Sequence, residues 1–290
     1  GMTAYAIATA YNFPDALAVA PAAAKNNAAL YLIKPEDGID AKTMDAIAKS
    51  NAKEVYILGG KLAVPLNVED QLATIDKFKD AGTIHRFAGK DRAETSTMIA
   101  KKFFPGAKEA FIATGMNFPD ALAGGSLAAY KDAPILLVDP TKATTLNKGQ
   151  LEALKDAKTV TLLGGPTIVP ETFANGFAFD RISGGAGGSR FDTAANISKR
   201  LPATAKAAWV VTGRNYPDAL IASSIAGRNF EPVLLSERDQ EVEATAKALE
   251  RFTDARIRYT AGGQVAILDE PAKVGFPEEA IDRLVSDPEQ

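Results

Sequence analysis

The sequence predicts an α/β protein built from three homologous domains, each containing a parallel sheet. A phrase of the type Asn-[Phe/Tyr]-Pro-Asp-Ala-Leu begins at Asn12, Asn117 and Asn215, at spacings of 105 and 98 residues. A glycine pair follows each phrase and keeps the same two spacings. Continuous apolar runs alternate with helical patterns of about ten residues, as crossovers between parallel strands require. The repeat is therefore the unit of the fold.

The second copy shows the expected elements most clearly. Its apolar runs lack alternation, which is typical of strands covered by helices on both faces. The expected elements are a strand at 109–114, a small-residue helix at 119–131, a buried strand at 133–138, a helix at 147–157, a strand and turn at 159–165, and a short helix at 170–177. Each copy is thus expected to be a small α/β domain.

The spacing of the copies also predicts domain boundaries. The first copy is expected to lack the opening segment that the other two have, because only eleven residues precede Asn12. We expect the three domains to pack around a pseudo-threefold centre or in a row. The predicted divisions are 1–84, 85–180, 181–275, and a C-terminal tail or helix at 276–290.

Composition excludes several classes of protein. The 290 residues are 46% hydrophobic and 24% charged, as in a globular protein, and 33 basic against 36 acidic residues leave a net charge of −3. No global field therefore attracts nucleic acid or a membrane surface. The chain has no cysteine and a single histidine, His85, so disulfides and most acid–base schemes repeated in each copy are excluded. We expect that a signal peptide has been removed before Gly1.

The repeated phrase has two interpretations, and both can hold. If Asn117 is an N-cap, Pro119 and Asp120 lie in the first helical turn as a variant of the capping box. Such a cap with a first-turn carboxylate stabilises a helix by about 1 to 2 kcal/mol. Alternatively, the phrase binds a ligand, because it follows the carboxyl end of a strand, where open α/β sheets place ligands.

The glycine pairs leave two alternatives open as well. They either release backbone donors that hold an anion or make a tight turn with positive φ. The lysine of a phosphate-binding loop is missing, which disfavours a nucleotide site. The pairs are Gly59-Gly60, Gly164-Gly165 and Gly262-Gly263.

Two arginine motifs precede the second and third phrases. Arg-x-x-Gly begins at Arg86 and at Arg181, and Arg-x-[Glu/Asp]-Thr follows at Arg92 and at Arg190, with three extra residues in the later motif. A cation near a helix start opposes the helix dipole, so Arg92 and Arg190 need a carboxylate or an external anion as partner. We favour a bridge between neighbouring copies, while an anionic ligand remains the alternative. The same two alternatives, a bridge between copies or an anionic ligand, apply to Arg86 and Arg181.

Together these motifs resemble the cell-wall-binding repeat type 2 family of Gram-positive surface proteins, and the resemblance covers nearly the whole chain. It implies three Toprim-like domains in a pseudo-trimer, located outside the cell at the wall. It also implies noncovalent attachment to an anionic wall polysaccharide or teichoic-acid-like polymer. The candidate ligand-binding residues are Asn12, Asp15, Arg86, Arg92, Thr95, Asn117, Asp120, Arg181, Arg190, Thr193, Asn215 and Asp218.

The sequence does not predict catalysis. A Toprim-like catalytic site would need Asp-x-Asp to hold Mg²⁺, and the chain has no such motif. It also lacks a Gly-x-Ser-x-Gly elbow with a histidine in reach. We therefore expect no catalytic residue, metal or cofactor. A surface-layer protein that self-assembles remains an alternative function, and a hydrolase that uses the Asn-Phe-Pro-Asp turns is a less favoured one.

Overall fold

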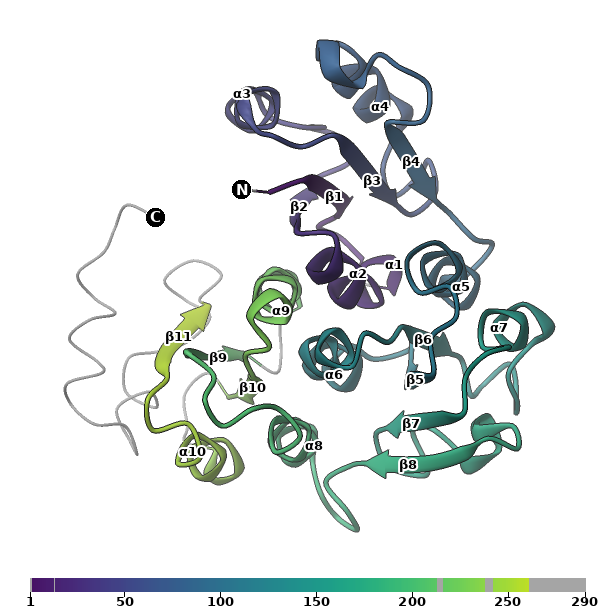
Figure 1. Ribbon diagram of the computed structural model, residues 1–290, viewed down its shortest axis with the longest axis vertical. Helices are drawn as coiled ribbons and strands as arrows, with labels where there is room; N and C mark the ends of the chain where they lie inside the picture. Colours follow the sequence, from purple (N-terminus) through teal and green to yellow (C-terminus); the bar gives the residue numbers. More distant parts are fainter. Residues whose placement is uncertain (1, 13, 213–215, 238–241, 261–290) are drawn as a thin grey trace.

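Each copy forms one parallel sheet in the computed structural model, which describes residues 2–12, 14–212, 216–237 and 242–260 (Figure 1). The strand order is β2-β1-β3-β4 in the first sheet, β6-β5-β7-β8 in the second and β10-β9-β11 in the described part of the third. The recurring order confirms the predicted fold class. The strands are β1 (Ala4–Thr9), β2 (Ala28–Ile33), β3 (Glu54–Leu58), β4 (Ile84–Phe87), β5 (Glu109–Thr114), β6 (Ile135–Val138), β7 (Thr159–Leu163), β8 (Ala178–Ile182), β9 (Ala207–Thr212), β10 (Val233–Ser236) and β11 (Arg256–Thr260).

Helices connect the strands, and one of them is broken in the first copy. Pro21 lies in α2, lacks a backbone N–H, and its ring conflicts with the carbonyl of Leu17, where α1 ends. The second copy has Ser126 at the corresponding position, and its helix runs unbroken. The helices are α1 (Pro14–Leu17), α2 (Val19–Lys25), α3 (Ala41–Lys49), α4 (Leu66–Ala73), η1 (Asp76–Phe78), α5 (Arg92–Phe103), α6 (Pro119–Tyr130), α7 (Lys148–Ala153), η2 (Glu171–Ala174), α8 (Arg190–Ser198), α9 (Pro217–Asn229) and α10 (Glu243–Leu249).

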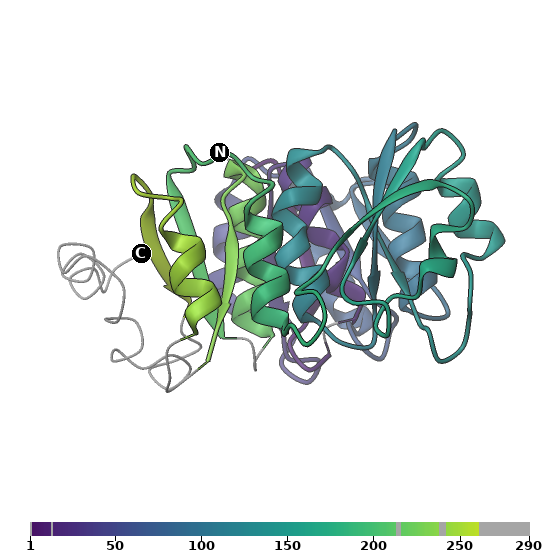
Figure 2. The same cartoon turned by 90° about the horizontal axis from the view of Figure 1, so that it is seen from below.

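Three corresponding helices, α2, α6 and α9, pack on one another at the centre of the molecule, with the sheets around them (Figures 1 and 2). Their contact surface consists of small residues. A Cβ added at Gly125 would lie 2.5 Å from Ser223 Oγ and 2.8 Å from Ala20 Cβ, and these three residues follow the Asn of each phrase by the same eight positions. Small residues let the helix backbones approach closely. The arrangement is thus a pseudo-threefold ring rather than a row.

A second set of threefold-related contacts joins the copies where the central helices end. One residue of each copy has a left-handed backbone there: Asn27, Asp132 and Phe230, with φ of 45°, 47° and 55°. Each contact pairs one of them with the last-turn residue of the preceding copy's helix. The contacts are an ion pair of 2.8 Å between Lys25 and Asp132, a ring pair with centroids 5.3 Å apart between Tyr130 and Phe230, and a hydrogen bond of 3.4 Å from Arg228 to Asn27. We call these three contacts the end latches.

The fourth strand of each complete sheet comes from the arginine segment. β4 pairs with β3, and β8 pairs with β7. The predicted boundaries after residues 84 and 180 therefore fall inside these strands, because the sequence pattern groups the arginine segment with the following copy. The glycine pair at 262–263 and the tail at 276–290 lie outside the described residues. Within the described part of the chain, no helix is long and apolar enough to cross a membrane. The Toprim likeness stays a prediction.

Candidate functional site

The first two repeated phrases lie at corresponding strand ends, as the sequence predicts for them. Asn12 follows the end of β1 by three residues, and Asn117 follows the end of β5 by the same distance. The second and third phrases lead directly into α6 and α9, and the first leads into the short α1, which α2 follows. Asn215 lies outside the described residues, and the side chain of Asp218 is likewise not described.

The predicted capping role of Asn117 is wrong. Helix α6 begins at Pro119, its N-cap is Phe118, and no side chain caps it. The Asn117 side-chain oxygen instead accepts a hydrogen bond of 3.0 Å from the adjacent Phe118 N–H. Asp120 consequently sits at the second helical position, and its carboxylate caps no backbone N–H of the helix start. The variant capping box therefore does not form.

In the first two copies, the phrase carboxylate packs on the first glycine of the glycine pair in the same copy. Gly59 and Gly164 have φ of 105° and 109°, which favours glycine. A Cβ would lie 2.9 Å from Asp15 Oδ2 in the first copy and 2.6 Å from Asp120 Oδ2 in the second. The glycine thus serves both the turn and the close approach of the carboxylate. Of the two interpretations of the glycine pair, this geometry supports the tight turn.

Arg86 and Arg181 fasten the loop that follows the glycine pair. Arg86 Nη1 donates to the carbonyls of Gly59 and Val64, both at 2.9 Å. Arg181 Nη1 makes the same pair of bonds in the second copy, at 2.7 and 2.9 Å. Arg86 also donates from Nε to Glu69 at 2.6 Å. These guanidinium groups therefore position the loop through its backbone.

Arg92 lies where the first two copies meet. Its Nη1 donates a short hydrogen bond to the Gly115 carbonyl, and a Cβ at Gly115 would lie 2.4 Å from Arg92 Cδ. This close contact explains why Gly115, which precedes the second phrase, has no side chain. The Arg92 charge also acts on Asp15 of the first copy, and the Arg190 charge acts on Asp120 in the same way at the next junction. Both arginines thus start helices, as predicted, and face the preceding phrase.

The threonine of each arginine motif ties the loop to the helix start. Thr95 Oγ1 accepts from the Gly89 N–H at 3.1 Å, and Thr193 Oγ1 accepts from the Gly184 N–H at the same distance. Both hydroxyls are buried. A Cβ at Gly89 would lie 2.6 Å from the Thr95 backbone nitrogen, so the glycine is required there. This packing accounts for the spacing of the motif.

Two corresponding clefts open at the junctions between copies. The first junction cleft, of about 460 Å³, lies between the phrase of the first copy and residues 89–93 at the start of α5. The second junction cleft, of about 430 Å³, lies between the phrase of the second copy and residues 183–190 before α8. Each cleft brings together an asparagine, an aspartate and an arginine predicted as candidates: Asn12, Asp15 and Arg92 in the first, and Asn117, Asp120 and Arg190 in the second.

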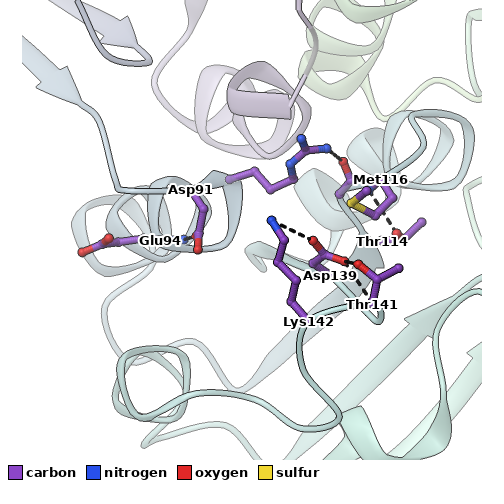
Figure 3. Close-up of polar contacts among 9 residues, drawn as sticks. Asp91, Glu94, Thr114, Met116, Asp139, Thr141 and Lys142 are labelled. Atoms are coloured by element: carbon purple, nitrogen blue, oxygen red, sulfur yellow. Dashed lines mark hydrogen bonds and ion pairs between the residues drawn. The ribbon is translucent and has the colours of Figure 1, made fainter.

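The clefts differ in charge, and the sequence does not reveal most of this difference. The charged residues that line the first junction cleft are Asp15, Lys90, Asp91, Arg92, Asp139 and Lys142. Figure 3 shows Asp91 at the start of α5 and the ion pair of 3.5 Å between Lys142 and Asp139 in the β6–α7 loop. The charged residues that line the second are Asp120 and Arg190, beside a glycine-rich loop at 184–188. The three extra residues of the later arginine motif are the sequence signal for that loop.

Burial shifts the titration of both phrase carboxylates. Burial raises the pKa of Asp120 to about 6, against the attraction of the Arg190 charge. Burial also raises the pKa of Asp15, while a hydrogen bond from Thr95 and the charge of Arg92 oppose the shift. The Asp120 carboxylate thus titrates near neutral pH in the second cleft.

The junction between the third and first copies is closed differently. The Tyr216 hydroxyl donates to the Ala10 carbonyl at 2.7 Å. Ala10 corresponds to Gly115, whose carbonyl accepts from Arg92 at the first junction. Sequence reasoning missed this contact, although Tyr in place of Phe and Ala in place of Gly were visible signals. Among the described residues, no group of three or more acidic or histidine side chains is placed to hold a metal ion.

Known proteins resemble the chain along most of its length. The family model for cell wall binding domain 2 matches residues 2–69, 86–174 and 183–271. The chain is 32% identical over 241 residues to the amidase enhancer of Bacillus subtilis, which covers 82% of the chain and 31% of that protein. It is 31% identical over 172 residues to N-acetylmuramoyl-L-alanine amidase LytC of the same organism, covering 58% and 34%. The chain therefore spans about a third of each relative.

Solved structures show the same fold. Cwp8 from Clostridium difficile superposes with a TM-score of 0.76 at 25% identity, over 97% of this chain and 47% of Cwp8. Cwp6 from the same organism superposes with a TM-score of 0.75 at 21% identity, over 89% and 41%. The arrangement of three parallel-sheet copies thus recurs in both.

Proposed function

The chain belongs to the cell wall binding domain 2 family, and from this premise we propose that it is a non-catalytic module that binds an anionic secondary polymer of the cell wall. A cell-wall-associated role follows from the family. The anionic ligand and the secreted location are our proposals. One observation carries the proposed anionic ligand: two junctions bring a guanidinium from one copy against the phrase of the preceding copy in corresponding clefts.

The central bundle supports binding at more than one point. Packing of α2, α6 and α9 holds the copies together, so the two junction clefts keep a fixed separation. A polymer with phosphate groups at regular intervals would engage both clefts, and the second engagement would gain from effective concentration. Guanidinium groups suit phosphate oxygens because their donors form a planar fork. Modest affinity at each cleft would then give firm attachment.

The hydrolase alternative finds no histidine among the described residues that line the two junction clefts. His85 lies in β4, where its Nε2 is 3.3 Å from Glu54 Oε1, and it lines neither junction cleft. Asp15 and Asp120 pack on glycine. LytC is named as an amidase, but the chain covers only 34% of it. These observations support a binding role for this part of such proteins.

A surface-layer protein that self-assembles is the second candidate, because membership of the cell wall binding domain 2 family does not distinguish it from a polymer-binding module. This function predicts that the purified chain forms large particles without any other component. Sedimentation of the purified chain across a hundredfold range of concentration separates the two functions. Particles that grow with concentration without added polymer would favour self-assembly, and a constant mass would favour the binding module.

Arg92→Gln tests the proposed polymer contact. We expect a loss of affinity of about ten- to a hundredfold for purified phosphate-bearing wall polymer, since a charge-assisted hydrogen bond contributes about 1.5 to 3 kcal/mol. The salt dependence should also flatten, because one screened contact is gone. The measurement is binding to immobilised polymer with and without its phosphate groups, alongside melting of each variant.

Arg200→Gln is the matched control, because Arg200 is exposed, pairs with Asp180 and lies outside both junction clefts. It removes the same charge and should leave polymer affinity unchanged. Equal affinity of the parent and Arg92→Gln would refute the role of this arginine. A loss of affinity that appears only together with a lower melting temperature would show that Arg92 acts by holding the copies together.

A further inference from the structure

Asp120 occupies an unusual position on the floor of the second junction cleft. It lines the cleft, yet burial is the main influence on its titration. Among the described residues, no hydrogen bond or ion pair reaches its carboxylate. Asp15 in the first cleft differs, because a hydrogen bond from Thr95 stabilises its ionised form. The second carboxylate therefore has room for a hydrogen bond with a ligand.

Few charges of the described residues face Asp120. Arg190 at the start of α8 is the other charged residue that lines this cleft within the described part of the chain, and its attraction opposes protonation. Asp192 on the same helix turns away, since it accepts from the Ser189 N–H at 2.8 Å and from its hydroxyl at 2.7 Å. Arg181 does not line this cleft and donates to the carbonyls of Gly164 and Val169. Loops 165–168 and 183–189 contribute no charge to the lining.

The charge of this cleft thus depends on one proton. With Asp120 ionised, its charge offsets that of Arg190 and the lining is neutral. With Asp120 protonated, the lining carries one positive charge. The first junction cleft behaves differently, because three acidic and three basic residues line it. One proton there alters one charged side chain of six, rather than one of two. An anion therefore gains most from protonation in the second cleft.

We infer that the second junction cleft binds an anion together with a proton, which Asp120 takes up. The carboxylate accepts the proton from the solvent, and the resulting O–H donates to an oxygen of the anion while the Arg190 charge attracts it. No covalent bond to the ligand forms. This inference rests on the proposed binding of an anionic polymer. The raised pKa of Asp120 agrees with proton uptake near neutral pH, and a bound anion raises that pKa further.

The test uses an oligomer of poly(glycerol phosphate), whose phosphodiesters keep a constant charge between about pH 5 and 7.5. Affinity for the parent chain should rise several-fold as the pH falls from 7.5 to 5.5, since Asp120 ionised at high pH must take up a proton on binding. Calorimetry at pH 6.5 in two buffers of different ionisation enthalpy counts the protons taken up. This count needs no variant, so it holds even if a substitution disturbs folding.

Asp120→Asn should bind the oligomer with little pH dependence and take up no proton. Asp180→Asn is the matched control, because Asp180 is exposed and lies outside both clefts, and it should keep the parent's proton uptake. Binding by the parent without proton uptake, or uptake that persists in Asp120→Asn, would overturn this inference alone. Absence of binding at every pH would overturn the proposed function and this inference together.

Discussion

Gly164 and Asp120 share one small space, and this contact explains why the two sequence landmarks keep the same spacing. The glycine turn and the phrase lie more than forty residues apart in the second copy, yet the carboxylate oxygen would be 2.6 Å from a Cβ at the glycine. The same contact recurs between Gly59 and Asp15. A change in either partner therefore disturbs the other, and the two are expected to vary together.

Gly164→Ala should lower the free energy of unfolding by about 1 to 3 kcal/mol, because alanine is strained at a φ of 109° and its methyl group would displace the carboxylate. Urea denaturation at pH 7 measures this loss. Gly165→Ala is the control, since a Cβ there meets nothing within 4 Å and its effect should stay within about 0.5 kcal/mol. Equal losses in the two variants would show that the contact with Asp120 is unimportant.

At the scale of elements, the sequence predicts the strands well and the helix starts less well. Apolar runs such as 133–138 became buried strands because burial on both faces leaves a plain compositional signal. Asn117 failed as a cap because packing of Asp120 on Gly164 competes with the local capping geometry, and a contact so distant in sequence is invisible in a local pattern. The pairing of β4 with β3 and of β8 with β7 is likewise invisible in a local pattern, which groups the arginine segments with the copies that follow them.

The candidate site could be predicted only in part. The phrase and the arginine motif were found because they recur, and the structure brings them together at two junctions. Lys90, Asp139 and Lys142 were missed because they occur in one cleft and have no repeated pattern. Repetition thus reveals what the clefts share, while their differences need the fold.

Tyr216→Phe tests the contact that closes the third junction. Loss of the hydroxyl that donates to the Ala10 carbonyl should cost about 1 kcal/mol of unfolding free energy, as for a typical hydrogen bond. Chemical denaturation detects this change. Tyr130→Phe provides the comparison, since no hydrogen bond from the Tyr130 hydroxyl occurs among the described residues, and it should be nearly neutral. A neutral Tyr216→Phe would mean that water replaces the bond.

At the scale of the whole molecule, one ring carries three different end latches. An ion pair, an aromatic pair and a hydrogen bond occupy corresponding places, so the copies share a backbone position and differ in chemistry. Phe230 adopts a left-handed φ of 55° that asparagine and aspartate hold more easily in the other copies. Its contact with Tyr130 offsets part of that strain, since an aromatic pair contributes about 0.5 to 1.5 kcal/mol.

Lys25→Glu tests the first end latch by placing two carboxylates together. The loss should be modest, about 1 kcal/mol or less, because the ion pair is exposed. Adding Asp132→Lys reverses both charges and should restore most of the stability. A double-mutant cycle followed by thermal melting measures the coupling. Additive effects of the two substitutions would exclude a direct interaction between these side chains.

The ring also determines how the molecule would yield under mechanical load. The chain itself passes from the first copy to the second and from the second to the third, so covalent backbone spans both junctions that contain a cleft. Noncovalent contacts alone join the third copy to the first, among them α2 against α9, the Tyr216 bond and the Arg228 latch. Tension applied to the two ends of the chain would therefore open this seam first. Both clefts would stay assembled while the ring opens into an arc. The chain under load would therefore extend before it released a ligand bound in the clefts.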